Sequence, residues 1–169
     1  MRHIAACHRA LGEFDKALDY YRRVEALTPD NVSLTLTIGH VLLEQNRTKE
    51  ALQQYFKADL MDSAKHRAWR PIAWCSFLLN DYERALDYYD RIDQYDTPSA
   101  QDLLNKGHVL LCQGRTQEAI DTYRKSLGLM GGITKKFRDM FKGDAMELRL
   151  HGVSAVDQAL IPDAVCAPK

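Results

Sequence analysis

The chain has 169 residues, 46% of them hydrophobic and 27% charged, which is typical of a soluble globular protein. Lys plus Arg and Asp plus Glu number 23 each, and this zero net charge argues against a nucleic-acid-binding protein. No apolar run approaches the roughly 18 residues of a membrane span, and the four cysteines lack the spacing of a zinc site or a disulfide framework. We therefore expect a cytoplasmic protein with reduced thiols and no membrane association.

An internal repeat dominates the sequence. The run ALDYY occurs at residues 17–21 and again at 85–89. Alanine recurs every 34 residues, with a tyrosine four residues after each alanine and a small residue twelve before it. Three columns of the repeat follow: Ala17, Ala51, Ala85 and Ala119; Tyr21, Tyr55, Tyr89 and Tyr123; Ala5, Gly39, Ala73 and Gly107.

Each repeat is predicted to be two helices joined by a short turn. The turn-like stretches are residues 11–14, 45–48, 79–82 and 113–116, with apolar residues at helical spacing on both sides. Small residues let the two helices approach closely, and stacked hairpins complete one another's core. We divide the chain into four repeats and a C-terminal capping segment: 1–31, 32–65, 66–99, 100–132 and 133–169.

Several local signals refine this division. Pro71 requires the first helix of the third repeat to begin late, near Ala68, or to bend, after a looser linker at 62–67. In the capping segment, Gly152 suits a helix stop, Ser154 suits an N-cap, and Pro162 is expected to end or kink the last helix. The first repeat lacks its start, so we expect a C-terminal piece of a longer array or an N-terminal face covered by a partner, including by self-association.

These columns resemble the tetratricopeptide repeat (TPR), with its Trp-x2-Leu-Gly-x2-Tyr, Ala-x3-Phe and Pro signature. The third repeat reads Trp69-x2-Ile72-Ala73 and then Ala85-x3-Tyr89, and the first ends with Pro29. The four repeats keep an unbroken phase, although Lys106 replaces a usual leucine. The resemblance implies an all-α, right-handed superhelical solenoid of antiparallel helix hairpins, whose concave groove holds peptide ligands.

Signals for catalysis are missing from the sequence. It has no phosphate-binding loop, no Gly-x-Ser-x-Gly and no His-Glu-x-x-His, and the histidines are not paired four residues apart. Cys75 has no evident histidine partner, so a buried inert thiol is the preferred interpretation. We therefore expect no enzyme activity, no cofactor and no metal.

The resemblance places positions 2, 5, 9 and 13 of each first helix on the groove. Trp74, flanked by Arg67 and Arg70, is the aromatic residue expected to bind a ligand that carries acidic and apolar side chains. The alternative is that Trp74 only packs on Pro71 and neighbouring helices. The predicted groove residues are Arg2, His40, Glu44, Arg67, Arg70, Trp74, Gln101 and His108.

The preferred function is a protein–protein interaction scaffold or adaptor that binds a peptide or a partner domain in this groove. One alternative is a regulatory or structural module of a larger protein. Another is an RNA-binding helical repeat, but this needs a basic groove along all repeats, and the second repeat offers only Glu44 as a charge.

Overall fold

The computed structural model describes residues 1–62 and 66–167, and every regular element in these residues is an α-helix. The chain forms two compact units, Met1–Leu79 and Asn80–Lys169, which we call the N-terminal and C-terminal units. The boundary lies inside the third predicted repeat, so the two helices of that repeat are described in separate units. The described helices are α1 (Arg2–Ala10), α2 (Phe14–Leu27), α3 (Val32–Glu44), α4 (Thr48–Met61), α5 (Trp69–Leu78), α6 (Tyr82–Tyr95), α7 (Ala100–Cys112), α8 (Thr116–Leu129), α9 (Thr134–Gly143), α10 (Ala145–Leu150) and α11 (Ala155–Cys166).

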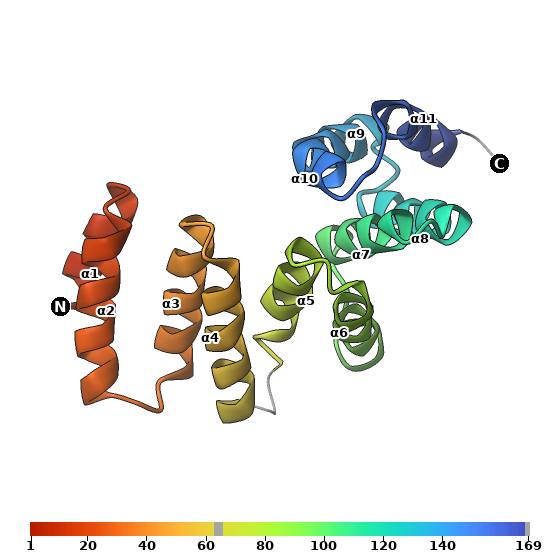
Figure 1. Ribbon diagram of the computed structural model, residues 1–169. Coiled ribbons are helices and arrows are strands. Elements are labelled where there is room, and N and C mark those ends of the chain that lie inside the picture. Colours follow the sequence, from red (N-terminus) through yellow and green to blue (C-terminus); the bar gives the residue numbers. More distant parts are fainter. Residues whose placement is uncertain (63–65, 168–169) are drawn as a thin grey trace. The chain divides into compact units, whose positions relative to one another are not determined.

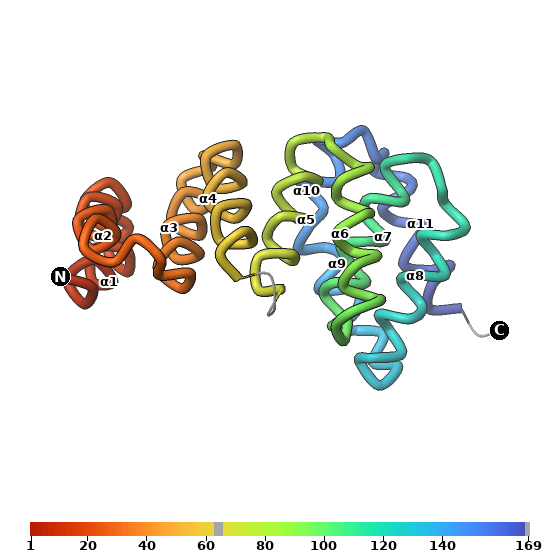
Figure 2. Tube along the Cα trace, turned by 90° about the horizontal axis from the view of Figure 1, so that it is seen from below, coloured from red at the N-terminus to blue at the C-terminus, as the bar shows by residue number. Residues whose placement is uncertain are grey.

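The N-terminal unit contains two helix hairpins and α5. Helix α1 packs on α2 and α3 packs on α4, while α2 contacts α3 and α4 contacts α5 (Figures 1 and 2). The small residues predicted at the helix crossings, including Ala5, Ala17, Ala51 and Ala73, are fully buried. The predicted small-residue columns therefore lie in the core, where close approach of the helices leaves no room for a larger side chain.

The C-terminal unit contains α6, the α7–α8 hairpin and the three helices of the capping segment. Helix α11 packs on α8 and α9, and α9 also contacts α8 and α10. Phe137, Phe141 and Leu148 from this segment join Leu104 and Tyr123 in one hydrophobic core. The capping segment is thus part of the folded core of this unit.

The turns inside the hairpins show a fourth column of the repeat. Gly12, Asn46, Asn80 and Gly114, again 34 residues apart, have φ angles of 74°, 58°, 63° and 75°. Glycine and asparagine are the residues that adopt this left-handed conformation most readily. The second helix of each hairpin begins two residues later, at Phe14, Thr48, Tyr82 and Thr116.

The local predictions met different outcomes. Helix α5 begins at Trp69, so Pro71 lies in its first turn, where a missing N–H removes no helical hydrogen bond. The side chain of Ser154 caps α11 by accepting a hydrogen bond from the Asp157 N–H, and Gly152 has a φ of 87° in the preceding turn. Pro162 does not end the last helix, as one form of the prediction had it, because α11 continues beyond it to Cys166. Residues 63–65 of the predicted linker lie outside the described residues.

Candidate functional site

The first helices of the repeats, α1, α3, α5 and α7, carry the predicted groove residues, except that Arg67 lies in the turn two residues before α5. We call their positions 2, 5, 9 and 13 the groove face, and we describe it separately in each compact unit. In the N-terminal unit it includes Arg2, His40, Glu44, Arg67, Arg70 and Trp74. In the C-terminal unit it includes Gln101 and His108.

A shallow pocket of about 260 Å³ lies beside Arg2, between α1, α2 and α3. Its apolar walls come from Ala6, Tyr21 and Leu34, and its polar groups come from Arg2, His3, Ser33 and Thr37. Arg2 is exposed. A cation above an apolar floor suits a ligand group that carries both an apolar surface and a negative charge.

Glu44 is held by a residue of the preceding repeat. Arg9 of α1 donates from Nε to Oε2 at 3.0 Å and from Nη2 to Oε1 at 2.6 Å, which is the bidentate geometry of a strong arginine–carboxylate pair. This contact lowers the pKa of Glu44. Both groups remain partly exposed, so the pair neutralises charge on the groove face more than it stabilises the fold.

His40 lies one helical turn before Glu44 and pairs with the repeated tyrosine. Its Nδ1 lies 2.8 Å from the hydroxyl oxygen of Tyr55, whose side chain is fully buried. Burial lowers the pKa of His40, and the positive charge of Arg9 lowers it further. The neutral imidazole is therefore favoured near pH 7, and the residue is exposed.

Arg67, Arg70 and Trp74 are the predicted groove residues of the third repeat. Arg67 pairs with Asp62 at 2.6 Å and donates to the Ser33 hydroxyl at 3.1 Å, so it connects the end of α4 to the start of α3. Trp74 is partly exposed and its ring lies 5.3 Å from that of Phe77. Arg70, on the same helix, is also partly exposed. An indole that keeps accessible surface has apolar area left for a ligand.

The fourth repeat differs from the prediction at His108. Its side chain is fully buried, because Phe141 and Asp144 of the capping segment cover it. His108 is therefore not accessible to a ligand in this structure. Leu104, another groove position of α7, is buried with it, whereas Gln101 is exposed and donates to Asn105 at 2.7 Å.

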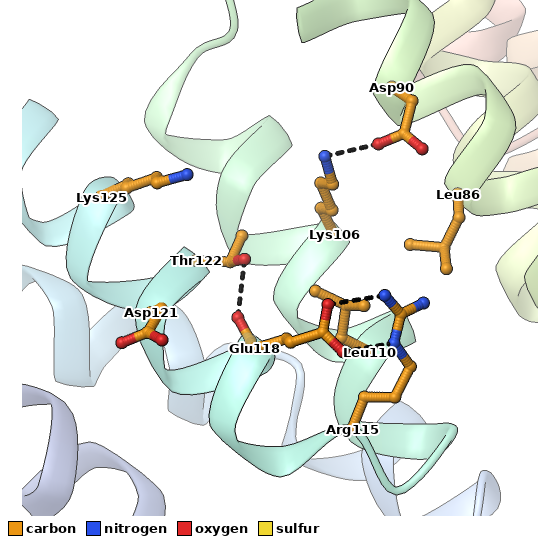
Figure 3. Close-up of a pocket in the computed structure, with 9 residues that line it drawn as sticks. All are labelled: Leu86, Asp90, Lys106, Leu110, Arg115, Glu118, Asp121, Thr122 and Lys125. Atoms are coloured by element: carbon orange, nitrogen blue, oxygen red, sulfur yellow. Dashed lines mark hydrogen bonds and ion pairs between the residues drawn. The ribbon is translucent and has the colours of Figure 1, made fainter.

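A further hollow of about 310 Å³ lies between α6, α7 and α8 of the C-terminal unit (Figure 3). Lys106 extends into it from the position at which the other repeats carry Ile4, Ile38 and Ile72. Burial acts to lower the pKa of Lys106, but hydrogen bonds from its ammonium to Asp90 and Asp93, both 2.6 Å, leave it raised. Arg115 pairs with Glu118 in the same hollow, so the charges that line the hollow largely cancel.

Catalytic and metal-binding geometries are not found in the described residues. No group of three or more His, Cys, Asp or Glu side chains among them is placed to hold a metal ion. Burial raises the pKa of the Cys75 thiol to about 12 and that of Cys112 to about 11, so neither is an activated nucleophile. Within residues 1–62 and 66–167, no helix has the length and apolarity needed to cross a membrane.

Three site residues were not predicted from the sequence. Arg9 and Thr37 lie one position away from the groove positions that the resemblance supplied, yet Arg9 binds Glu44 and Thr37 lines the pocket beside Arg2. For Arg9, the sequence signal was its charge, which is opposite to that of Glu44, 35 residues later. Asp144 had no such signal, because its contact with His108 depends on how the capping segment folds.

The hairpins, their 34-residue interval and the partly exposed face of their first helices define a helical-repeat protein. The family model of the tetratricopeptide repeat matches residues 2–130. This chain belongs to the tetratricopeptide repeat family.

Solved structures of similar fold share little sequence with the chain. A crystal structure of MamA is 20% identical with a TM-score of 0.73, covering 96% of this chain and 92% of that one. MamA from Desulfovibrio magneticus RS-1, residue 41 to its end, is 13% identical with a TM-score of 0.75, covering 96% and 88%. YrrB, a TPR protein with an unusual peptide-binding site, is 16% identical with a TM-score of 0.68, covering 97% and 82%. No curated protein matches the chain. These likenesses support the solenoid fold of stacked helix hairpins.

Proposed function

We propose that this chain is a non-enzymatic protein–protein interaction module that binds a peptide or partner segment on the groove face of its N-terminal unit. The observation that carries the proposal is the partly exposed Trp74 on α5, the helix that also carries Arg70. A tryptophan gains much by leaving water, and the pocket beside Arg2 offers a second apolar surface with a cation. The ligand is a segment with acidic and apolar side chains.

The charges of this face favour a peptide over RNA. Arg9 is neutralised by Glu44, and Arg67 by Asp62, so these arginines do not form a continuous basic strip. A phosphate backbone needs several unneutralised cations along its path, whereas a peptide needs a few charges and an apolar contact. A nitrocellulose filter assay with mixed RNA tests the alternative, and we expect no retention at physiological salt.

The test of the proposal is a pull-down with the whole chain, read by mass spectrometry. Trp74→Ala should remove most partner capture, because truncating a central aromatic residue typically costs about 2 kcal/mol, or roughly thirtyfold in affinity. Leu60→Ala is the control, since Leu60 is an apolar side chain of α4 that is 87% exposed. Arg70→Glu should weaken capture in a salt-dependent way.

Circular dichroism of Trp74→Ala decides how its result is read. A folded variant that captures the same partners at full strength shows that the binding surface lies elsewhere. A variant that unfolds shows that Trp74 belongs to the core, and that the groove face was assigned wrongly at this position.

A further inference from the structure

The histidine–tyrosine pair of the second repeat occurs again in the fourth, with nearly the same geometry. His40 Nδ1 lies 2.8 Å from the Tyr55 hydroxyl, with ring centroids 5.4 Å apart and planes at 55°. His108 Nδ1 lies 2.7 Å from the Tyr123 hydroxyl, with ring centroids 5.5 Å apart and planes at 60°. The two imidazoles therefore have equivalent orientations within their repeats.

The capping segment shows what such a histidine binds. The Nε2 atom of His108 lies 3.2 Å from Oδ2 of Asp144, and the ring of Phe141 packs edge-on against its imidazole, with centroids 5.4 Å apart and planes at 69°. Phe141 lies near the end of α9, and Asp144 follows three residues later. An aromatic residue and, one helical turn on, a carboxylate together enclose this histidine.

His40 has the same orientation but lacks both contacts. The residues two repeats before Phe141 and Asp144 are Ala73 and Ser76, which offer neither an aromatic ring nor a carboxylate. The Ser76 hydroxyl is buried and makes no hydrogen bond within the described residues. Among these residues His40 Nε2 has no hydrogen-bond partner, and the side chain is exposed where that of His108 is fully buried.

The protonation state of His40 decides whether its Nε2 atom donates or accepts a hydrogen bond. In a neutral imidazole whose Nδ1 accepts a hydrogen bond from the Tyr55 hydroxyl, Nε2 carries the hydrogen and is a donor. The burial and Arg9 charge that lower the pKa of His40 favour this neutral form. Glu44, the carboxylate whose charge acts on His40, accepts hydrogen bonds from Arg9 on both of its oxygens.

We propose that His40 is the docking point for a partner helix that carries a carboxylate and, one turn before it, an aromatic side chain. The partner helix approaches His40 from its exposed side, because α5 already packs beside the pair with the buried residues Ala73 and Ser76. Its carboxylate accepts from Nε2 of His40 and its aromatic ring packs on the imidazole, the two contacts that Asp144 and Phe141 make at His108. This inference rests on the proposed function, because it names the chemistry of a ligand for the same groove face.

The probe is a fluorescein-labelled synthetic peptide of residues 134–150, which contains Phe141 and Asp144. Its binding to the full chain is measured by fluorescence anisotropy. We expect saturable binding that is about tenfold or more weaker for peptides with Asp144→Asn or Phe141→Ala, since each removes one of the two contacts. The chain variant His40→Ala should bind the unchanged peptide more weakly, to a similar extent. Leu60→Ala should bind that peptide with the affinity of the wild-type chain.

Tyr55→Phe tests the orientation of the imidazole. It keeps the ring in the core and removes the hydroxyl bonded to His40, so we expect severalfold weaker binding with unchanged helicity. If the peptide does not bind at concentrations up to millimolar, the inference is overturned. Equal binding by wild type and His40→Ala also overturns it, because the peptide then sits elsewhere, for example by displacing the chain's own capping segment. If Trp74→Ala removes partner capture while the His40 variants keep it, the proposed interaction module is supported and the proposed docking point at His40 is wrong.

Discussion

A Cβ atom built on Gly39 would lie 2.5 Å from Cε1 of Tyr55, too close for two carbon atoms that are not bonded. The same clash occurs between Gly107 and Tyr123. These are the two repeats in which the tyrosine hydroxyl reaches a histidine at the next position of the helix. The other two repeats have Ala5 and Ala73 at the glycine position and no histidine after it. The missing side chain thus allows the close approach that forms the histidine–tyrosine pair.

Gly39→Ala should therefore destabilise the protein. The ring of Tyr55 is fully buried and cannot move away freely, so we expect a loss on the order of 1–3 kcal/mol in the free energy of unfolding, measured by urea denaturation. Gly128→Ala is the matched control, because Gly128 lies inside α8 with no atom within 4 Å of its added Cβ. That variant should gain about 0.5–1 kcal/mol from helix propensity. Equal stability of Gly39→Ala and wild type would contradict the close contact.

The left-handed turn residue of the second repeat gives a second prediction. Asn46 has a φ of 58°, so Asn46→Ala should cost roughly 1 kcal/mol and Asn46→Gly should be neutral or stabilising. Thermal melts of the two variants measure the difference. Asn46→Ala melting at or above the temperature of Asn46→Gly would show that the turn adopts another conformation.

Most of the fold could be predicted from the sequence because its repeat is regular. The spacing of Ala17, Ala51, Ala85 and Ala119 sets the hairpins, and each predicted turn agrees with the observed helix ends to within a residue. The capping segment has no repeated partner to fix its position. Its route follows from packing of Phe137 and Phe141 against Tyr123, a tertiary contact that local patterns do not encode.

The candidate site was predictable to a smaller degree. The resemblance to the tetratricopeptide repeat supplies the groove positions, so residues such as Arg2, His40 and Trp74 can be selected from the sequence. Whether a groove position stays accessible depends on what packs over it. Chemically identical histidines at equivalent positions, His40 and His108, have opposite exposure because only His108 meets the capping segment.

The capping segment should be essential for the stability of the C-terminal unit. Phe141 is 2% exposed and contacts the rings of both His108 and Tyr123, so Phe141→Ala should cost about 3–5 kcal/mol. Met146→Ala is the control within the same segment, because its side chain is 66% exposed, and we expect a change within about 0.5 kcal/mol. Urea denaturation compares the two. Similar stabilities would show that the segment is a tail that adds little to the core.

Acidification should destabilise the folded chain through His40 and His151. Burial is the largest cause that lowers the pKa of each, with Arg9 adding to it at His40 and Glu147 opposing it at His151. The unfolded chain, with imidazole pKa values near 6.5, therefore binds protons that the folded chain resists. Stability is then highest above about pH 6.5 and falls as the pH drops through this value toward the lowered folded pKa.

Arg9 lowers the pKa of the Glu44 carboxyl, so protonation of Glu44 reduces the stability of the fold only at more acidic pH, below the ordinary pKa of a glutamate. We expect urea midpoints to fall from pH 7.5 to 5.5, and the double variant His40→Gln, His151→Gln to show a smaller fall over the same range. An unchanged slope in the double variant would mean that neither histidine resists protonation when the protein is folded.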